Sequence, residues 1–497
     1  MRPLLIISLI FLFHSQRVKC ETIVTQISQY GITWTFEKPV VAGQFITGDW
    51  WVIGPVNIVR VTPTPGSISA DTTHISVNHW NDSSLSRDTV MRNGSMIVDK
   101  PSKTQGYDSR SKMYRPTESI IFPFILKPNQ SLISTESNVN LPVDNFCKAC
   151  VTSFDKTVKT VLKSAAVLTC LSSVPPKDAF RPPYAGKLKL IFLARNIDYA
   201  KLPKLSIPDS VPDWATYEHY FERPWLDHIM SWQHQEIVPN ENQPNYGREQ
   251  ARLVSIASLM LMLDVPKEKK EKLTIELIQR GIDLYGLAMA GGYWNEGGGL
   301  SSGRKWPIIF ASIMLNKPSI AELPATALFL EDTETYYGKG WFGQTALWQI
   351  IAHHEYKGTY EEMSPDTWGK WEKVSEGYRI CCTSSAWVGA ALAARYLKAV
   401  KLWGHDAYFD YVDRWMREDD PYAEKRGAFK RPEKEGKASD VFVTQMWKAN
   451  RANSPKQPNS GKNMKWVWKG KIGGMVSISA KTKTEGLIRR MAIKKNM

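Results

Sequence analysis

Residues 203–212, Pro-Lys-Leu-Ser-Ile-Pro-Asp-Ser-Val-Pro, separate two kinds of sequence pattern along the chain. They contain prolines at both ends and show no periodic apolar residues, which is typical of a linker. Before them, short runs rich in β-branched and aromatic residues alternate with clusters of Gly, Pro, Asn, Asp and Ser. After them, apolar residues recur at helical spacing. The pattern therefore predicts an α+β protein with more than one domain.

The region before the linker, residues 21–202, is predicted to be a β-sandwich. Short strands divided by turn residues are typical of two packed antiparallel sheets. The candidate strands are residues 32–36, 50–61, 120–126, 158–171 and 188–193.

The region from the linker onward, residues 203–451, is predicted to be an α-helical domain similar to an α/α-toroid. Long loops rich in Gly, Trp and Tyr join the candidate helices. Serial helices connected in this way suggest helical hairpins in an incomplete toroid, although no repeat of fixed length is visible. The candidate helices are residues 214–232, 247–263, 267–290, 305–315, 341–353 and 384–403.

The N-terminus predicts export. Arg2 precedes an apolar run at residues 4–13, and residues 18–20 fit a cleavage site, so residues 1–20 are interpreted as a signal peptide. The run is too short to anchor the chain stably in a bilayer. The N-terminal region also holds N-glycosylation sequons at Asn81, Asn93 and Asn129. We therefore expect a secreted, extracellular glycoprotein without a membrane span.

Positive charge is concentrated at the C-terminal end. Residues 424–497 contain 19 Lys and Arg against 5 Asp and Glu, a surplus of 14, while the whole chain has a surplus of 15. Residues 452–497, rich in Lys, Asn, Ser and Gly, are predicted to form a disordered basic tail. The expected partners are acidic polysaccharides or acidic matrix components. Nucleic acid would fit the charge, but export argues against it.

The cysteines leave several pairings open. Removal of the signal peptide leaves five, an odd number in an oxidising compartment. Either Cys147 or Cys150 could bridge to Cys170, while a bridge between the adjacent Cys381 and Cys382 would need a strained ring. The C-x-x-C spacing at 147–150 has no second pair and no nearby His, so no metal site is expected. No sequence motif indicates a cofactor.

Several distinctive runs carry a resemblance to known proteins. These are GQFITGDWWVIGP at 43–55, QGYDSR at 105–110, DAFRPPY at 178–184, YFERPWLDH at 220–228, NYGR at 245–248, GRKWP at 303–307, YRICCT at 378–383 and WGHDAYFD at 403–410. Together they resemble a family of large secreted bacterial proteins, mostly uncharacterised, over roughly residues 30–451. The layout of a β-module joined to a helical toroid is also similar to that of secreted polysaccharide lyases, although a shared layout does not establish function.

The chain departs from the bacterial pattern at one position. In that pattern a Gly-Gly-His-Gly run precedes the Gly-Arg-Lys-Trp-Pro motif, whereas this chain has Leu300 in place of the His. If that His is catalytic in the relatives, the resemblance implies that this chain has lost the activity.

A lyase acting on uronates needs a cation or amide at the carboxylate, a base for the C5 proton and an acid for the leaving oxygen. The candidate catalytic residues are Asn245, Tyr246, Arg248, Arg304 and Tyr378. The candidate substrate-binding residues are His234, Tyr293, Glu296, Lys305 and Arg379. Each also has a structural interpretation, as a helix-end group, an ion pair or a core residue with a satisfied hydroxyl.

Two functions follow from these observations. The first is a secreted extracellular matrix protein, for instance of a skeletal or shell matrix, that binds acidic polysaccharides on a lyase-like scaffold without catalysis. The second is an active secreted lyase or hydrolase acting on uronic-acid-containing polysaccharide. The basic tail, the sequons and Leu300 favour the first, and the polar residues retained in the helical region favour the second.

Overall fold

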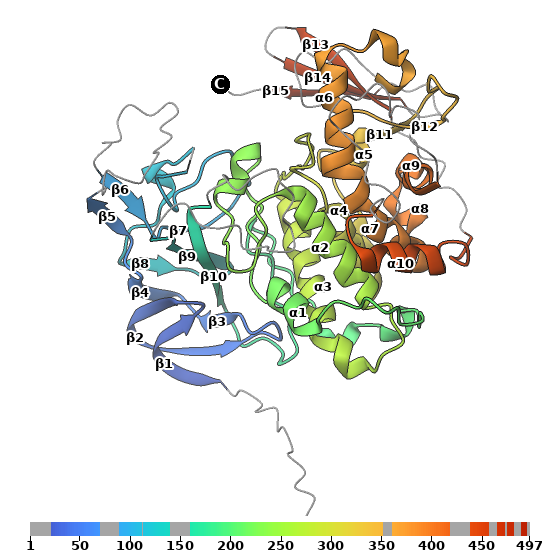
Figure 1. Ribbon diagram of the computed structural model, residues 1–497. Helices are drawn as coiled ribbons and strands as arrows, with labels where there is room; N and C mark the ends of the chain where they lie inside the picture. Colours follow the sequence, from blue (N-terminus) through green and yellow to red (C-terminus); the bar gives the residue numbers. More distant parts are fainter. Residues whose placement is uncertain are drawn as a thin grey trace, which may run out of the picture.

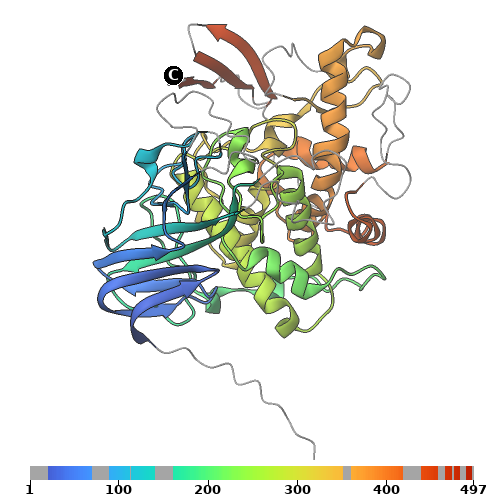
Figure 2. The ribbon, with the colours of Figure 1, turned by 60° about the vertical axis from the view of Figure 1, so that its left-hand side comes forward.

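A computed structural model describes residues 21–69, 89–111, 113–139, 160–350, 360–417 and 438–456, together with three strands between 465 and 494. The predicted signal peptide, the sequon at Asn81 and both Cys147 and Cys150 lie outside these residues. The chain has an α+β architecture, in which a curled β-sheet lies beside a group of helices (Figures 1 and 2).

The N-terminal region is built on one mixed sheet. Its strands run in the order β7-β9-β10-β3-β2-β4-β8, with β1 beside β2, and among these pairs only β10 and β3 are parallel. A separate hairpin pairs β5 with β6. The strands are β1 (Thr22–Gln29), β2 (Ile32–Gln44), β3 (Trp50–Ile53), β4 (Val56–Thr62), β5 (Gly66–Ser69), β6 (Thr89–Arg92), β7 (Ser95–Met96), β8 (Phe124–Leu126), β9 (Gln130–Ser137) and β10 (Leu162–Leu171).

The expected β-sandwich is not confirmed. All the described strands of this region except β5 and β6 form one curled sheet (Figure 2), and the parallel pair contradicts an entirely antiparallel arrangement. Residues 188–193 form no strand, although the other four predicted segments contain strands. Period-2 burial, seen at Ile32, Trp34 and Phe36, explains why the strands were predictable. Strand order depends on long-range pairing, which local periodicity does not encode.

The helices follow from residue 214 onward, and most lie close to their predicted positions. Helix α2 packs against α7, and α3 packs against α4. These pairings do not establish the expected toroid. The helices are α1 (Trp214–Phe221), α2 (Gly247–Met260), α3 (Lys267–Met289), α4 (Lys305–Met314), α5 (Leu330–Glu334), α6 (Lys370–Tyr378), α7 (Ser384–Tyr396), α8 (Val400–Trp403), α9 (Asp406–Arg417) and α10 (Val441–Asn450).

The helix predicted at residues 341–353 was wrong in its described part. Strands β11 (Thr335–Tyr337) and β12 (Ala346–Trp348) instead form an antiparallel hairpin. Both strands are rich in aromatic and other large residues, and the connection between them contains three glycines. Two short runs of this kind around a Gly-containing connection favour a hairpin over a helix.

A shared hydrophobic core joins the sheet to the helices. Ile133 and Val167 of the sheet belong to the same buried cluster as Leu253 of α2 and Leu284 of α3. Within the predicted linker, the backbone of Leu205 accepts a hydrogen bond from Asp264 and donates one to Met262. The linker is therefore attached to the end of α2, and the two regions pack as neighbours around one core.

A buried ion-pair network reinforces this junction. The Arg181 guanidinium donates to Asp49, which lies just before β3, at 2.7 Å and to Asp283 of α3 at 2.6 and 2.9 Å. All three side chains are at most 3% exposed. Because removing one partner would leave a buried charge uncompensated, this network should strongly specify how the sheet meets α3.

The C-terminal tail differs from the expected disordered segment. Strands β13 (Lys465–Ile472), β14 (Met475–Lys481) and β15 (Arg489–Lys494) form an antiparallel sheet, and β13 lies near β11 (Figure 1). The net charge of the segment suggested disorder, but its aromatic and β-branched residues favour strands. Within the described part of the chain, every helix is too short or too polar to cross a bilayer.

Cys170 lies on β10 as a buried free thiol. The predicted bridge from Cys147 or Cys150 to this residue is therefore wrong. The thiol faces the backbone of Leu126 within the sheet core, and burial raises its pKa to about 12. A thiol in this environment behaves as a small apolar side chain.

Candidate functional site

A glycine-rich loop at residues 296–303 lies between the start of α2 and the turn that precedes α7. A Cβ at Gly247 would collide with the carbonyl oxygens of Gly299 and Leu300. Gly299 has a φ of +87°, and a Cβ there would collide with the carbonyl of Cys382. These glycines are therefore required because backbone segments of the protein itself approach closely, and a ligand is not needed to explain them.

Two of the predicted catalytic tyrosines meet at this loop. Tyr246 precedes α2, and its hydroxyl donates a hydrogen bond to the carbonyl of Gly298. The ring of Tyr378, at the end of α6, packs against Gly298. Burial raises the pKa of Tyr246 well above its usual value, so the hydroxyl stays protonated at neutral pH. In this state Tyr246 is a donor, and it would need activation to act as a base.

Arg248 lies beside the tyrosines but is engaged by the protein. Its Nε donates to Glu249 Oε1 at 2.6 Å, and its Nη1 donates to the carbonyl of Cys381 at 2.7 Å. The guanidinium lies 5.6 Å from the centroid of the Tyr246 ring. Its charge is therefore matched by a carboxylate on the same helix.

Cys381 and Cys382 are joined by a disulfide at the edge of this cluster. They lie in a π-turn at Arg379–Thr383, between α6 and α7. Such turns occur frequently at functional sites. This bridge closes a small ring between adjacent cysteines, the arrangement expected from the sequence to need a strained ring. Cys381 is partly exposed, while Cys382 is buried under the glycine-rich loop.

Arg304 and His234 belong to a second cluster, which adjoins the end of the loop. The Arg304 Nη2 donates to Asp227 Oδ1 at 2.8 Å and lies 3.3 Å from His234 Nε2. Arg280 of α3 contacts the other oxygen of Asp227. Burial alone would raise the pKa of Asp227, but the charges of Arg280 and Arg304 outweigh it and hold that pKa far below its usual range. Arg304 also donates to the carbonyl of Leu300, which links the two clusters.

His234 is uncharged in this environment. Burial and the neighbouring Arg304 charge lower its pKa to about 4. Its Nδ1 lies 2.9 Å from the carbonyl of Ser231. Neutral His234 and paired Arg304 fit a structural network better than a free binding surface.

Lys305 and Arg379, which directly follows Tyr378, form separate ion pairs. Lys305 contacts Asp332 and lies 5.3 Å from the centroid of the Trp403 ring. Arg379 is fully buried and forms two hydrogen bonds to Glu376, at 2.7 and 2.8 Å. Both cations are thus matched within the protein.

The remaining predicted residues occupy less defined positions. Asn245 is buried just before α2. Tyr293 is partly buried against the helical core, and burial raises its pKa. Glu296 begins the glycine-rich loop, where its backbone amide donates to the hydroxyl of Ser301 at 3.1 Å. The structure brings Tyr246, Arg248 and Tyr378 together and places Arg304 and His234 in the adjoining network.

Two buried acids escaped sequence analysis. Glu331 and Glu334 lie on α5, and Glu331 accepts a hydrogen bond from the amide of Gly303 at 2.6 Å. Glu334 faces the backbone of Gly298 and the indole of Trp348, but neither carboxyl oxygen has a hydrogen bond of regular geometry. A Leu-Glu-Asp-Thr-Glu run usually indicates a solvated helix face. Nothing in the sequence therefore indicated that these acids are buried.

Glu334 is held as a neutral acid. Burial first, and then the nearby Glu331 carboxyl, raise its pKa well above the usual value. Burial also raises the pKa of Glu331, to about 7. The Glu334 carboxyl and the Tyr246 hydroxyl both approach the backbone of Gly298, so this protonated carboxyl lies beside the tyrosine cluster. The cluster can therefore donate protons, but its described cations are already paired. Among the described residues, no group of three or more His, Cys, Asp or Glu side chains could hold a metal ion.

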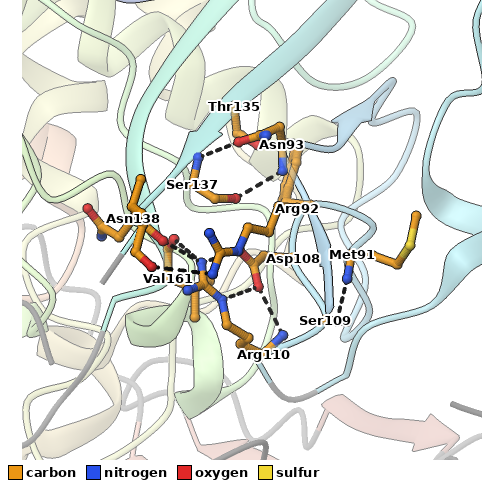
Figure 3. A network of polar contacts seen from close by, with 12 residues as sticks. Met91, Arg92, Asn93, Asp108, Ser109, Arg110, Thr135, Ser137, Asn138 and Val161 are labelled. Carbon is orange, nitrogen blue, oxygen red and sulfur yellow. Dashed lines mark hydrogen bonds and ion pairs between the residues drawn. The ribbon is translucent and has the colours of Figure 1, made fainter. Parts of the chain in front are cut away.

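The two described sequon asparagines have different environments. Asn93 Oδ1 accepts from the amide of Ser137 at 2.8 Å (Figure 3). Its Nδ2 donates to the carbonyl of Thr64 at 3.2 Å. Asn129 is exposed. An attached glycan would replace one Nδ2 hydrogen, so Asn129 is the less constrained acceptor in the folded chain.

Comparison with protein-family models, curated proteins and solved structures finds no match for this chain. Its function must therefore be inferred from its own residues.

Proposed function

We propose that this chain is an extracellular protein that binds acidic polysaccharides or related polyanions and holds them without cleaving them. The observation that carries the proposal is the charge of residues 424–497, which supply a surplus of 14 in a chain whose total surplus is 15. A concentrated positive field attracts polyanions and accelerates their association.

The fold of the tail supports this role. Strands β13, β14 and β15 contain seven Lys and Arg and no Asp or Glu. Their pairing gives these basic residues a common scaffold. Strand β13 also lies near β11, the strand that begins directly after Glu334. A paired sheet keeps its charges closer together than a disordered tail, which favours binding to a polymer that carries regularly spaced anions.

The pairing of cations in the helical region argues against catalysis. A lyase needs a cation free to neutralise the substrate carboxylate. Arg248, Arg304 and Arg379 are instead matched by Glu249, Asp227 and Glu376. Separating one of these arginines from its buried carboxylate would cost about 3–5 kcal/mol, the cost of breaking comparable buried pairs.

Binding to immobilised alginate, glucuronan and heparin tests the proposal. The full-length chain should bind these polymers in a salt-sensitive manner, because screening weakens attraction between exposed charges. Neutralising Lys465, Lys469 and Lys471 to Gln should weaken binding, whereas neutralising the exposed Lys103 and Lys373 of the body should not. Equal binding by both variants, or no binding by the wild type, contradicts the proposal.

A second function, an active polysaccharide lyase, is favoured by one observation. The neutral Glu334 carboxyl and the Tyr246 hydroxyl both approach the backbone of Gly298, so a proton donor and a potential base adjoin the same loop. Absorbance of unsaturated products after incubation with the same polymers tests this activity. Turnover that disappears in both Tyr246→Phe and Glu334→Gln would establish the lyase and overturn the non-catalytic proposal.

A further inference from the structure

Helices α4 and α7 both start at the candidate site and end together at a different surface. Helix α4 begins directly after Arg304, and α7 begins two residues after Cys382. Their other ends are followed by Asn316 and Lys398, two turn residues with φ values of +54° and +55°. At 1.5 Å per residue, the helices separate their two ends by roughly 15–20 Å.

Two adjoining cavities form a groove at this far end. One has a volume of ≈ 440 Å³ and is lined by residues from Arg195 to Asp198 and from Leu315 to Lys317. The other has a volume of ≈ 550 Å³ and extends to Tyr396, Lys398 and Leu402. Asn316 lines both, so the two cavities adjoin at this residue. Their volumes are within the range of sites that bind small molecules.

The charged side chains along this far-end groove are mostly positive and can contact a ligand. Lys201, Lys317 and Lys398 line it, against the carboxylate of Asp198. Lys317 and Lys398 are exposed, and within the described residues neither forms an ion pair. Lys201 is held in place by a 2.7 Å hydrogen bond to the carbonyl of Ile313. Because this carbonyl carries no net charge, the hydrogen bond does not neutralise the ammonium group. An anionic ligand would therefore meet unneutralised ammonium groups here.

The far-end groove also offers apolar surface. Leu402 is 38% exposed, and the partly buried Tyr396 is fixed by a hydrogen bond from its hydroxyl to the carbonyl of Asn450 at 2.9 Å. A fixed aromatic ring and an exposed leucine between separated lysines can contact the apolar faces of sugar rings while the lysines contact their anionic substituents.

We infer that the far-end groove binds a short segment of an acidic polysaccharide, through Lys317 and Lys398. The inference rests on the proposed function and adds to it a site on the folded body, separate from both the tail and the tyrosine cluster. A long anionic chain bound at the groove and at the tail would gain affinity because the second contact is intramolecular.

Lysine acetylation of the full-length chain, read by mass spectrometry, tests the groove directly. An alginate tetrasaccharide presents carboxylates alone, and a heparin tetrasaccharide also presents sulfates. Either should slow acetylation of Lys317 and Lys398 without slowing that of Lys373, and neutral cellotetraose should protect neither. Protection by one probe identifies the anion that the groove prefers.

Affinity measurements with the same tetrasaccharides complete the test. Lys317→Gln/Lys398→Gln should weaken binding by about five- to tenfold, the effect of losing two exposed charge contacts. The matched control Lys103→Gln/Lys373→Gln should leave it unchanged. If the groove lysines are not protected, or if both double variants bind with equal affinity, the proposed groove site is overturned. The proposed function still stands in that case if polymer binding depends on the tail. A wild type that binds neither tetrasaccharide nor polymer overturns both.

Discussion

The two ends of helix α4 use positive charge in opposite ways. At its N-terminal end, Arg304 and Lys305 are buried and each contacts a carboxylate, Asp227 and Asp332 respectively. Beyond its C-terminal end, Lys317 is exposed and forms no ion pair within the described residues. Buried and matched charges stabilise a fold, whereas exposed and unmatched charges remain available to a ligand. A basic residue in a distinctive motif is therefore not by itself evidence of a binding site.

The strongest test of this comparison removes the charge of Asp227. Asp227→Asn leaves the buried Arg280 and Arg304 without their anion, so we expect a loss of about 3–5 kcal/mol in the free energy of unfolding. Urea denaturation measures it. The exposed Asp209→Asn is the control and should change stability by less than about 0.5 kcal/mol. Equal losses in the two variants would refute the structural role of the pair.

Acid should weaken the same region. His234 has its pKa lowered to about 4 by burial and by Arg304, whereas a histidine in the unfolded chain titrates near 6.5. The unfolded state therefore binds protons first, and stability is lost as the pH falls from 6.5 to 4. The loss is on the order of 3 kcal/mol for a shift of this size.

The variant His234→Gln isolates this contribution. Its stability should fall less steeply over that pH interval than that of the wild type. Some slope should remain, because His228 also has a pKa lowered to about 4 by burial. Identical slopes for variant and wild type would show that His234 does not titrate with unfolding.

A third substitution compares two buried carboxyls. Glu334→Gln makes the same chemical change as Asp227→Asn, but among the described residues no cation contacts Glu334, and burial keeps it protonated at neutral pH. We expect a change below about 1 kcal/mol below pH 4.5, where this carboxyl is protonated in both the folded and the unfolded chain. Because the raised pKa costs the wild type stability as the pH rises above 4.5, the variant should gain relative stability as the pH rises from there to neutral. A loss as large as that of Asp227→Asn would mean that Glu334 is ionised.

The smallest effect is expected at the far-end groove. Lys317→Gln/Lys398→Gln removes two exposed charges and should shift the free energy of unfolding by less than about 0.5 kcal/mol. Thermal and urea unfolding at two salt concentrations check this. A large destabilisation would place these lysines among the structural cations, like those at the start of α4.

Sequence patterns predicted the local elements well and the site only in part. Apolar residues at helical spacing indicated α2, α3 and α7, and the structure brings the candidate residues Tyr246, Arg248 and Tyr378 together. Glu334 was missed because its importance depends on burial, which a short acidic run does not reveal. Arg304 and Lys305 were predicted as ligand contacts because their carboxylate partners, Asp227 and Asp332, are distant in the sequence.

The sequence by itself determined the change from strands to helices near residue 203, the positions of most helices and the concentration of basic charge at the C-terminal end. These properties depend on composition and on the spacing of neighbouring residues. The tertiary structure decided the single curled sheet, the hairpin of β11 and β12, the free thiol of Cys170 and the Cys381–Cys382 disulfide. It also decided which cations are matched, because ion pairs form between residues that are adjacent only after the chain has folded.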